Sequence, residues 1–197
     1  MEEKVIYQAS DNTLSLRQGE ILTGVVQYKP VAAEIKTDLT NGFSFSPILH
    51  PYVIVVTQDC DLDWDYTARS VSNGSPTKLL NSIILCEIDT AENIRSTDGI
   101  NSKEWGLVAN HRHERFYFFE KILPIYESEQ KGLPELTADF KKVFGVDVET
   151  LYRQIAIGTV ARRTVLKSPY LEHFSKRYYN FHSRVALPFQ YESEREV

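Results

Sequence analysis

A thiol between two carboxylates is the first feature of this chain that could do chemistry. Cys60 lies between Asp59 and Asp61, directly after an apolar run that is typical of a buried strand. A cysteine thiolate beside a histidine can act as a nucleophile, but neighbouring carboxylates raise the pKa of a thiol and oppose that role. Side chains alternate between the two faces of a strand. We therefore expect Cys60 to point inward as a core thiol, while Asp59 and Asp61 cap a turn and are candidate binding residues.

Two histidines two positions apart are the second chemical feature. On a strand, His111 and His113 would share one face and could bind a metal ion, whereas on a helix they would not. The chain has neither Cys-x-x-Cys nor His-Glu-x-x-His spacing. We predict no metal site and no cofactor, and we place both histidines at a solvated helix end.

Cations and tyrosines are interleaved toward the C-terminal end, as they are on nucleic-acid surfaces. The candidate binding cations are Arg162, Arg163, Lys176 and Arg177, and the tyrosines are Tyr170, Tyr178 and Tyr179. Residues 1–150 hold 14 Lys and Arg against 23 Asp and Glu, a net charge of −9, while residues 151–197 hold 8 against 4. This basic end can seat a polyanion, or it can dock on the acidic body with its tyrosines in the core. Both alternatives stay open.

The elements that must position these residues are mostly strands. Apolar and β-branched runs predict five strand segments, at residues 14–31, 49–56, 79–88, 115–119 and 136–140. Helical spacing is confined to residues 101–112, 148–155 and 168–185. Residues 33–47 are predicted as a loop or hairpin arm, and residues 63–78 as an exposed loop. We expect a mainly β fold: an SH3-like, mostly antiparallel barrel over residues 1–145, with a helical segment over residues 146–197 packed on it.

The last helix has the strongest local signals. Ser168 can cap it, Pro169 suits its first position and Pro188 can end it. An apolar stripe at spacings of three and four predicts that the helix belongs to the core. The stripe consists of Leu171, Phe174, Tyr178, Phe181 and Val185.

The composition predicts a cytoplasmic protein. No apolar run approaches the roughly 18–20 residues that a membrane helix needs, and the first residues do not resemble a signal peptide. The two cysteines, Cys60 and Cys86, are too few for a disulfide framework, and we expect each to be a buried thiol.

Short motifs give this chain two family resemblances. Residues 17–21 (RQGEI), the strand from His50 to Thr57 and the strand over residues 83–88 resemble the opening of the PemK/MazF-like toxins. That resemblance implies an SH3-like barrel that cleaves RNA, with His50 standing where the family has a catalytic arginine and with Thr57 as its partner. The chain is also similar to a family of uncharacterised bacterial proteins through residues 58–62 (QDCDL), 162–173 (RRTVLKSPYLEH) and 184–188 (RVALP). This second resemblance implies a bacterial cytoplasmic protein of a mobile-element or defence locus.

Two function classes follow. The favoured one is a non-catalytic binding or accessory module that acts through a protein or nucleic-acid partner. The alternative is an endoribonuclease toxin with His50 and Thr57 at its catalytic site. Toxic overexpression that is lost on His50→Ala would separate them in favour of the enzyme.

Overall fold

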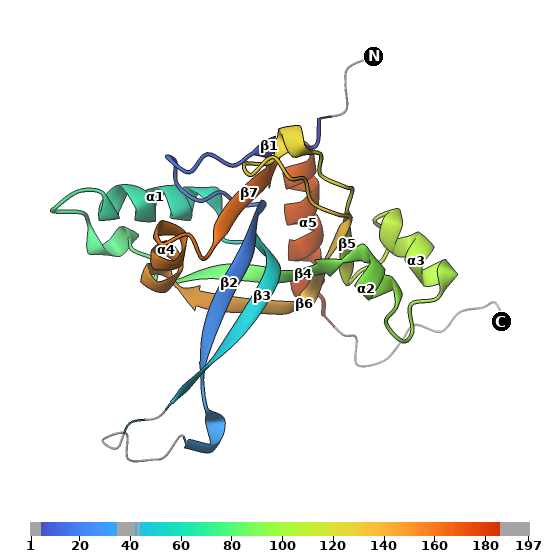
Figure 1. The fold of residues 1–197 in the computed structure, drawn as a ribbon, viewed down its shortest axis with the longest axis horizontal. Helices are drawn as coiled ribbons and strands as arrows, with labels where there is room; N and C mark the ends of the chain where they lie inside the picture. The colour runs from blue at the N-terminus through green and yellow to red at the C-terminus, as the bar shows by residue number, and fades with distance from the viewer. Residues whose placement is uncertain (1–4, 35–41, 43, 186–197) are drawn as a thin grey trace.

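A seven-stranded antiparallel sheet organises the protein. The computed structural model describes residues 5–34, 42 and 44–185 (Figure 1). The strand order is β1-β7-β2-β3-β4-β6-β5, and every pairing is antiparallel. The strands are β1 (Tyr7–Ala9), β2 (Glu20–Pro30), β3 (Phe45–Val55), β4 (Ser82–Thr90), β5 (Phe116–Phe119), β6 (Leu136–Asp147) and β7 (Ala161–Leu166).

The sheet is open, so the expected closed barrel is wrong. The edge strands β1 and β5 do not pair with each other, although a barrel would require that pairing. The coarser prediction is confirmed, because the fold is mostly antiparallel sheet with helices packed on it. Helix α5 (Tyr170–His182) lies between the two edge strands (Figure 1). We call the gap between β1 and β5, which α5 covers, the seam.

Helix α5 is part of the largest core cluster, as its apolar stripe predicts. Phe174 and Phe181 are buried, and the Phe174 ring packs against Tyr117, Phe119 and Phe140 from the sheet. The end of the predicted stripe is wrong: Val185 lies beyond the helix and is 85% exposed. The predicted cap at Ser168 is wrong as well, since Pro169 occupies the N-cap position without a side-chain cap. Pro188 lies outside the described residues.

The opposite face of the sheet carries a second core with two further helices. Leu62 of α1 (Asp59–Arg69) and Leu151 of α4 (Val148–Ala156) pack there against Val53 and Leu85. The predicted exposed loop over residues 63–78 is therefore wrong in its first half. The sequence pattern did not predict this helix because its central buried residue, Asp65, is charged. The Asp65 carboxylate accepts hydrogen bonds from Arg69, from Tyr152 and from the backbone N–H of Leu80.

The remaining helices follow their local signals. Helix α3 (Ser102–Ala109) begins after Asn101, whose side chain caps it by accepting from two backbone N–H groups of the first turn. Together with the short α2 (Ala91–Arg95), it covers Phe116 of β5. No helix among the described residues is long and apolar enough to cross a membrane.

The first two long strands form a ribbon that leaves the body of the protein. Residues 25–30 of β2 pair with residues 45–50 of β3 in an uninterrupted register, and Figure 1 shows them projecting away from the sheet. We call this ribbon the arm. At its base Gly24 adopts a φ of +80°, and an added Cβ there would lie 2.6 Å from the carbonyl oxygen of Thr159. The predicted loop or hairpin arm over residues 33–47 lies partly outside the described residues.

Candidate functional site

A cavity of about 610 Å³ opens at the seam, beside the start of α5. It is lined by residues from both edge strands and from the loop after α3, because the sheet leaves this side unclosed. We call it the seam pocket. Its lining residues are Ile6, Tyr7, Ala109, Asn110, His111, Tyr117, Phe118, Phe119, Glu120, Leu166, Pro169, Tyr170 and His173.

The floor of the seam pocket is a tyrosine that contacts two histidines. Tyr117 of β5 is only 3% exposed, and its hydroxyl lies 3.1 Å from Nδ1 of His173 on α5. The ring of His111 lies 4.5 Å from the Tyr117 ring and 5.3 Å from the His173 ring, centroid to centroid. The pocket thus brings together three side chains from three separate elements.

Part of the accessible wall of the pocket consists of rings, beside the exposed Asn110, Glu120 and Pro169. His173 is exposed, while His111 and Tyr170 are half-buried and present part of their surface to the cavity. Three ring-bearing side chains therefore stand around the buried Tyr117 hydroxyl. Such an arrangement suits a flat, ring-bearing ligand, since aromatic faces prefer offset or edge contacts with other rings.

Arg177 fixes the loop that carries one of these histidines. It lies two turns along α5 from Tyr170, and its guanidinium donates to the backbone carbonyls of His111 and His113. His111 itself adopts a φ of 55°, in the left-handed region that non-glycine residues rarely occupy. The anchoring of two carbonyls by one arginine explains how this turn is held.

The protonation states in the pocket favour neutral groups at neutral pH. Although the residue is exposed, partial desolvation of its ring lowers the pKa of His173, and the nearby cations Arg177 and Lys176 lower it further. Burial raises the pKa of Tyr117 above its ordinary value, although Arg177 opposes that shift. A neutral imidazole with its proton on Nε2 can accept the Tyr117 O–H at Nδ1. The pair is therefore a neutral hydrogen bond rather than an ion pair.

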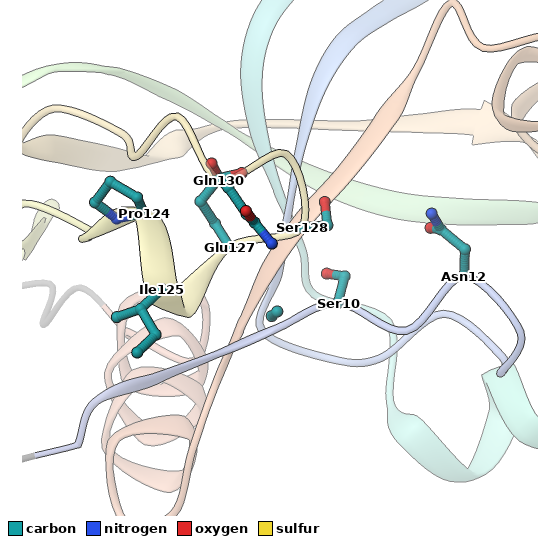
Figure 2. Close-up of a pocket in the computed structure, with 8 residues that line it drawn as sticks. Ser10, Asn12, Pro124, Ile125, Glu127, Ser128 and Gln130 are labelled. Carbon is teal, nitrogen blue, oxygen red and sulfur yellow. The ribbon is translucent and has the colours of Figure 1, made fainter.

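A second hollow lies at the other side of β1, where Figure 2 draws its lining residues. Its carboxylate, Glu127, is turned into the protein. Glu127 accepts from Arg163 and from the backbone N–H groups of Glu129 and Gly132. Ser128 donates its hydroxyl to the carbonyl of Arg162. The polar groups of this hollow are already hydrogen-bonded within the protein, so the seam pocket is the better candidate site.

The structure separates the two residues predicted for a ribonuclease site. His50 lies within β3 and Thr57 follows the end of that strand, so the seven-residue interval corresponds to roughly 20 Å of extended chain. The His50 ring is buried and stacks on Phe144 at 4.0 Å, and burial lowers its pKa. The Thr57 hydroxyl accepts from the backbone N–H of Ile84 at 2.7 Å. Both side chains are thus engaged within the sheet at separate places.

The predicted cationic surface is divided by the structure. Arg162 and Arg163 lie in β7 and are buried, where they pair with Glu20 and with Glu127 respectively. They do not face solvent, so they leave the predicted binding surface. Lys176 is exposed on α5, and Arg177 is half-buried and holds the loop after α3. Of the four predicted cations, only Lys176 and Arg177 lie near the seam pocket.

The predicted core thiol at Cys60 is wrong. Residues 59–61 open helix α1 instead of ending a strand, and Cys60 is exposed, whereas Cys86 is buried as expected. The Asp59 carboxylate accepts a bidentate pair of hydrogen bonds from the Arg17 guanidinium and a third hydrogen bond from the backbone N–H of Gln18. Asp61 lies half-buried beside Cys60. Within the described residues, no group of three or more His, Cys, Asp or Glu side chains is placed to hold a metal ion.

Sequence reasoning missed Tyr117 and His173 as a pair. They are 56 positions apart and meet only because α5 packs across the seam onto β5. Each has a local explanation in its own element: Tyr117 in an aromatic strand and His173 on a basic helix. The comparisons with known proteins return nothing for this chain: no family model, no curated protein and no solved structure matches it. The two family resemblances therefore stay predictions.

Proposed function

We propose that this protein is a non-catalytic binding module that holds the base of a single-stranded nucleic acid in the seam pocket. The observation that carries the proposal is the set of three accessible rings, His111, Tyr170 and His173, around the buried Tyr117 hydroxyl. A stacking platform of this kind accepts any base, since every base has a π-face. On the motif resemblance, we place such a module in a bacterial mobile-element or defence locus.

The charges near the pocket support a short contact with few phosphates. Lys176 and Arg177 lie close enough to His173 to lower its pKa, so a phosphate beside these two cations would meet positive potential, while the carboxylate of Glu120 adds a negative charge to the pocket lining. Arg162 and Arg163 are neutralised in buried pairs and add nothing to it. With a net charge of −5 over the whole chain, we expect binding through stacking with a weak dependence on salt.

We assign Tyr117 a binding role because its ring is buried and its hydroxyl lies 3.1 Å from Nδ1 of His173. Burial raises the pKa of Tyr117, so the hydroxyl keeps its proton at neutral pH and supplies a hydrogen bond. The alternative, a ribonuclease toxin, needs His50 and Thr57 at one phosphate. Their separation along β3 and the burial of His50 offer that alternative no support. Overexpression should be benign, and His50→Ala should not change its effect on growth.

The direct test is a fluorescence anisotropy titration with labelled single-stranded RNA and DNA of about 12 nucleotides at about 50 mM salt. We expect His173→Ala and Tyr170→Ala each to weaken binding about 10-fold, as the loss of a stacking partner does. Lys176→Gln should weaken it less and should make the log–log salt slope shallower by about 0.7.

Lys142→Gln is the matched control, because Lys142 is an exposed lysine of β6 that pairs with Glu87. Its affinity should equal that of the unmodified protein. Absence of binding at about 100 µM protein would overturn the proposal, since even non-specific nucleic-acid binding reaches that range. Equal weakening by Lys142→Gln and Lys176→Gln would also contradict it.

A further inference from the structure

The turn that follows α3 carries one wall of the seam pocket, the ring of His111. The backbone N–H of His111 donates to the carbonyl of Val108 at 3.0 Å, and the N–H of Arg112 donates to the carbonyl of Leu107 at 2.7 Å. These bonds tie the N–H groups of the turn to α3. His111 itself has a φ of 55°, a conformation that a non-glycine residue keeps only where its surroundings hold it.

The carbonyl groups of the same turn are held by a different helix, through Arg177 of α5. Its Nη1 donates to the carbonyl oxygen of His111 and its Nη2 to that of His113, so one rigid guanidinium plane spans both carbonyls. A lysine ammonium is a point donor on a flexible stem and cannot reproduce this two-point geometry. The turn is therefore clamped between α3 and α5.

Arg177 lies close to every member of the pocket cluster. Tyr170, His173 and Arg177 are spaced by three and four positions, so they share one face of α5. The guanidinium is near enough to Tyr117 and to His173 to lower the pKa of each. One helix thus supplies two walls of the pocket and also the clamp on the third wall, His111.

We propose that Arg177 is a positioning residue of the seam pocket, which holds the His111 ring in place beside Tyr117 and His173 and does not itself bind a phosphate. The inference rests on the proposed function, since it concerns the same pocket. The sequence alone groups Arg177 with Lys176 as a binding cation. In the structure Lys176 is exposed, whereas Arg177 is half-buried and directs two of its nitrogens to backbone carbonyls. Direct phosphate contact therefore falls to Lys176, and Arg177 keeps a stacking wall in position.

Amide hydrogen exchange and proton NMR of the ligand-free protein test the clamp. In Arg177→Gln the amides of residues 111–113 should exchange at least about 10-fold faster, because the turn opens locally more often. Cross-peaks between the ring protons of His111 and Tyr117, whose centroids lie 4.5 Å apart, should weaken. Arg177→Lys should restore part of both signals, since an ammonium can reach one carbonyl. Lys176→Gln, at the exposed neighbour on the same helix, is the matched control and should change neither signal.

Titration with the labelled single-stranded RNA separates positioning from phosphate contact. Arg177→Gln should weaken binding about 10-fold, as the loss of one stacking partner does, and should leave the log–log salt slope unchanged. Lys176→Gln should instead make that slope shallower by about 0.7. Equal shallowing in both variants would overturn the proposal, because Arg177 would then be a phosphate contact.

Failure of this inference and failure of the proposed function give different results. Unchanged exchange of residues 111–113 in Arg177→Gln would overturn the positioning role whether or not RNA binds. Absence of RNA binding by the unmodified protein would overturn the proposed function, while a weakened His111–Tyr117 contact in Arg177→Gln would still support the clamp. If far-UV circular dichroism shows that Arg177→Gln does not fold, Arg177→Lys carries the same measurements with smaller expected changes.

Discussion

The hydroxyl of Tyr7 donates a hydrogen bond to the carbonyl oxygen of Glu120 at 3.0 Å, across the seam of the sheet. Tyr7 begins the edge strand β1, and Glu120 directly follows the other edge strand, β5. The two edges therefore approach each other without forming a strand pair. The seam pocket lies where that pairing is missing, so the candidate site is a consequence of incomplete closure.

Tyr7→Phe should remove this bond while keeping the buried ring. We expect a loss of about 1 kcal/mol in the free energy of unfolding, the net contribution of one partly buried hydrogen bond. Urea denaturation measures it. Tyr28→Phe, at an exposed tyrosine of the arm, is the comparison and should change stability by less than about 0.5 kcal/mol. Equal effects in both variants would mean that the seam bond is not structural.

Phe174→Ala should be among the most damaging changes in the chain. The ring is fully buried and contacts three aromatic side chains of the sheet, so its removal should cost about 3–5 kcal/mol through lost burial and a residual cavity. Tyr179→Ala, on the exposed face of the same helix, should cost little. Denaturant melts of the two variants give the difference. A cost below about 1 kcal/mol for Phe174→Ala would show that α5 is peripheral to folding.

The buried pair of Glu127 and Arg163 should make stability fall in acid. Burial alone would raise the pKa of Glu127, but hydrogen bonds from Arg163 and from three backbone N–H groups outweigh it and lower the pKa to about 2. A lowered folded-state pKa means that this contribution is complete above the ordinary glutamate pKa, about 4.5. It is then lost progressively between pH 4.5 and 2.

Unfolding free energies measured from pH 7 to pH 3 test this linkage. Glu127→Gln should lose about 3 kcal/mol at pH 7, because the buried Arg163 loses its nearer anion and keeps only Glu129, at 3.5 Å. Its stability should also fall less steeply in acid than that of the unmodified protein. Parallel curves for the two proteins would argue against the role of Glu127.

The two cysteines should differ sharply in reactivity. Cys60 is exposed at the first turn of α1, whereas Cys86 is fully buried in β4, where burial raises the pKa of its thiol. Native protein should therefore react with one equivalent of a thiol reagent, and unfolded protein with two. Cys60→Ser should abolish the native reaction. Labelling of Cys86 in the folded Cys60→Ser variant would contradict the burial of this strand.

The elements whose signals are local could be predicted from neighbouring residues alone. The β-branched run before Thr57 and the run over residues 83–88 predict β3 and β4, because a strand that is buried on both faces needs continuous apolar side chains. The stripe that includes Phe174 predicts α5, and the helical spacing over residues 101–112 predicts α3. In each case the deciding residues are neighbours along the chain.

The tertiary structure alone decided the elements that bury charge. Helix α1 buries Asp65 against Arg69 and Tyr152, and strand β7 buries Arg162 against Glu20, 142 positions away. A local pattern assigns charged residues to the surface, since a buried charge is tolerated only beside a partner. That partner is invisible until the chain is folded. The same reason assigned Arg162 to a binding surface.

The candidate site is another feature that the tertiary structure decides and that local sequence signals do not predict. Tyr117 and His173 are joined by the packing of α5 over an open seam, and whether a sheet closes depends on the pairing of its first and last strands. Strand runs can predict a sheet of this composition, but they carry no information on that final pairing. Here β1 and β5 stay apart, and the pocket exists because they do.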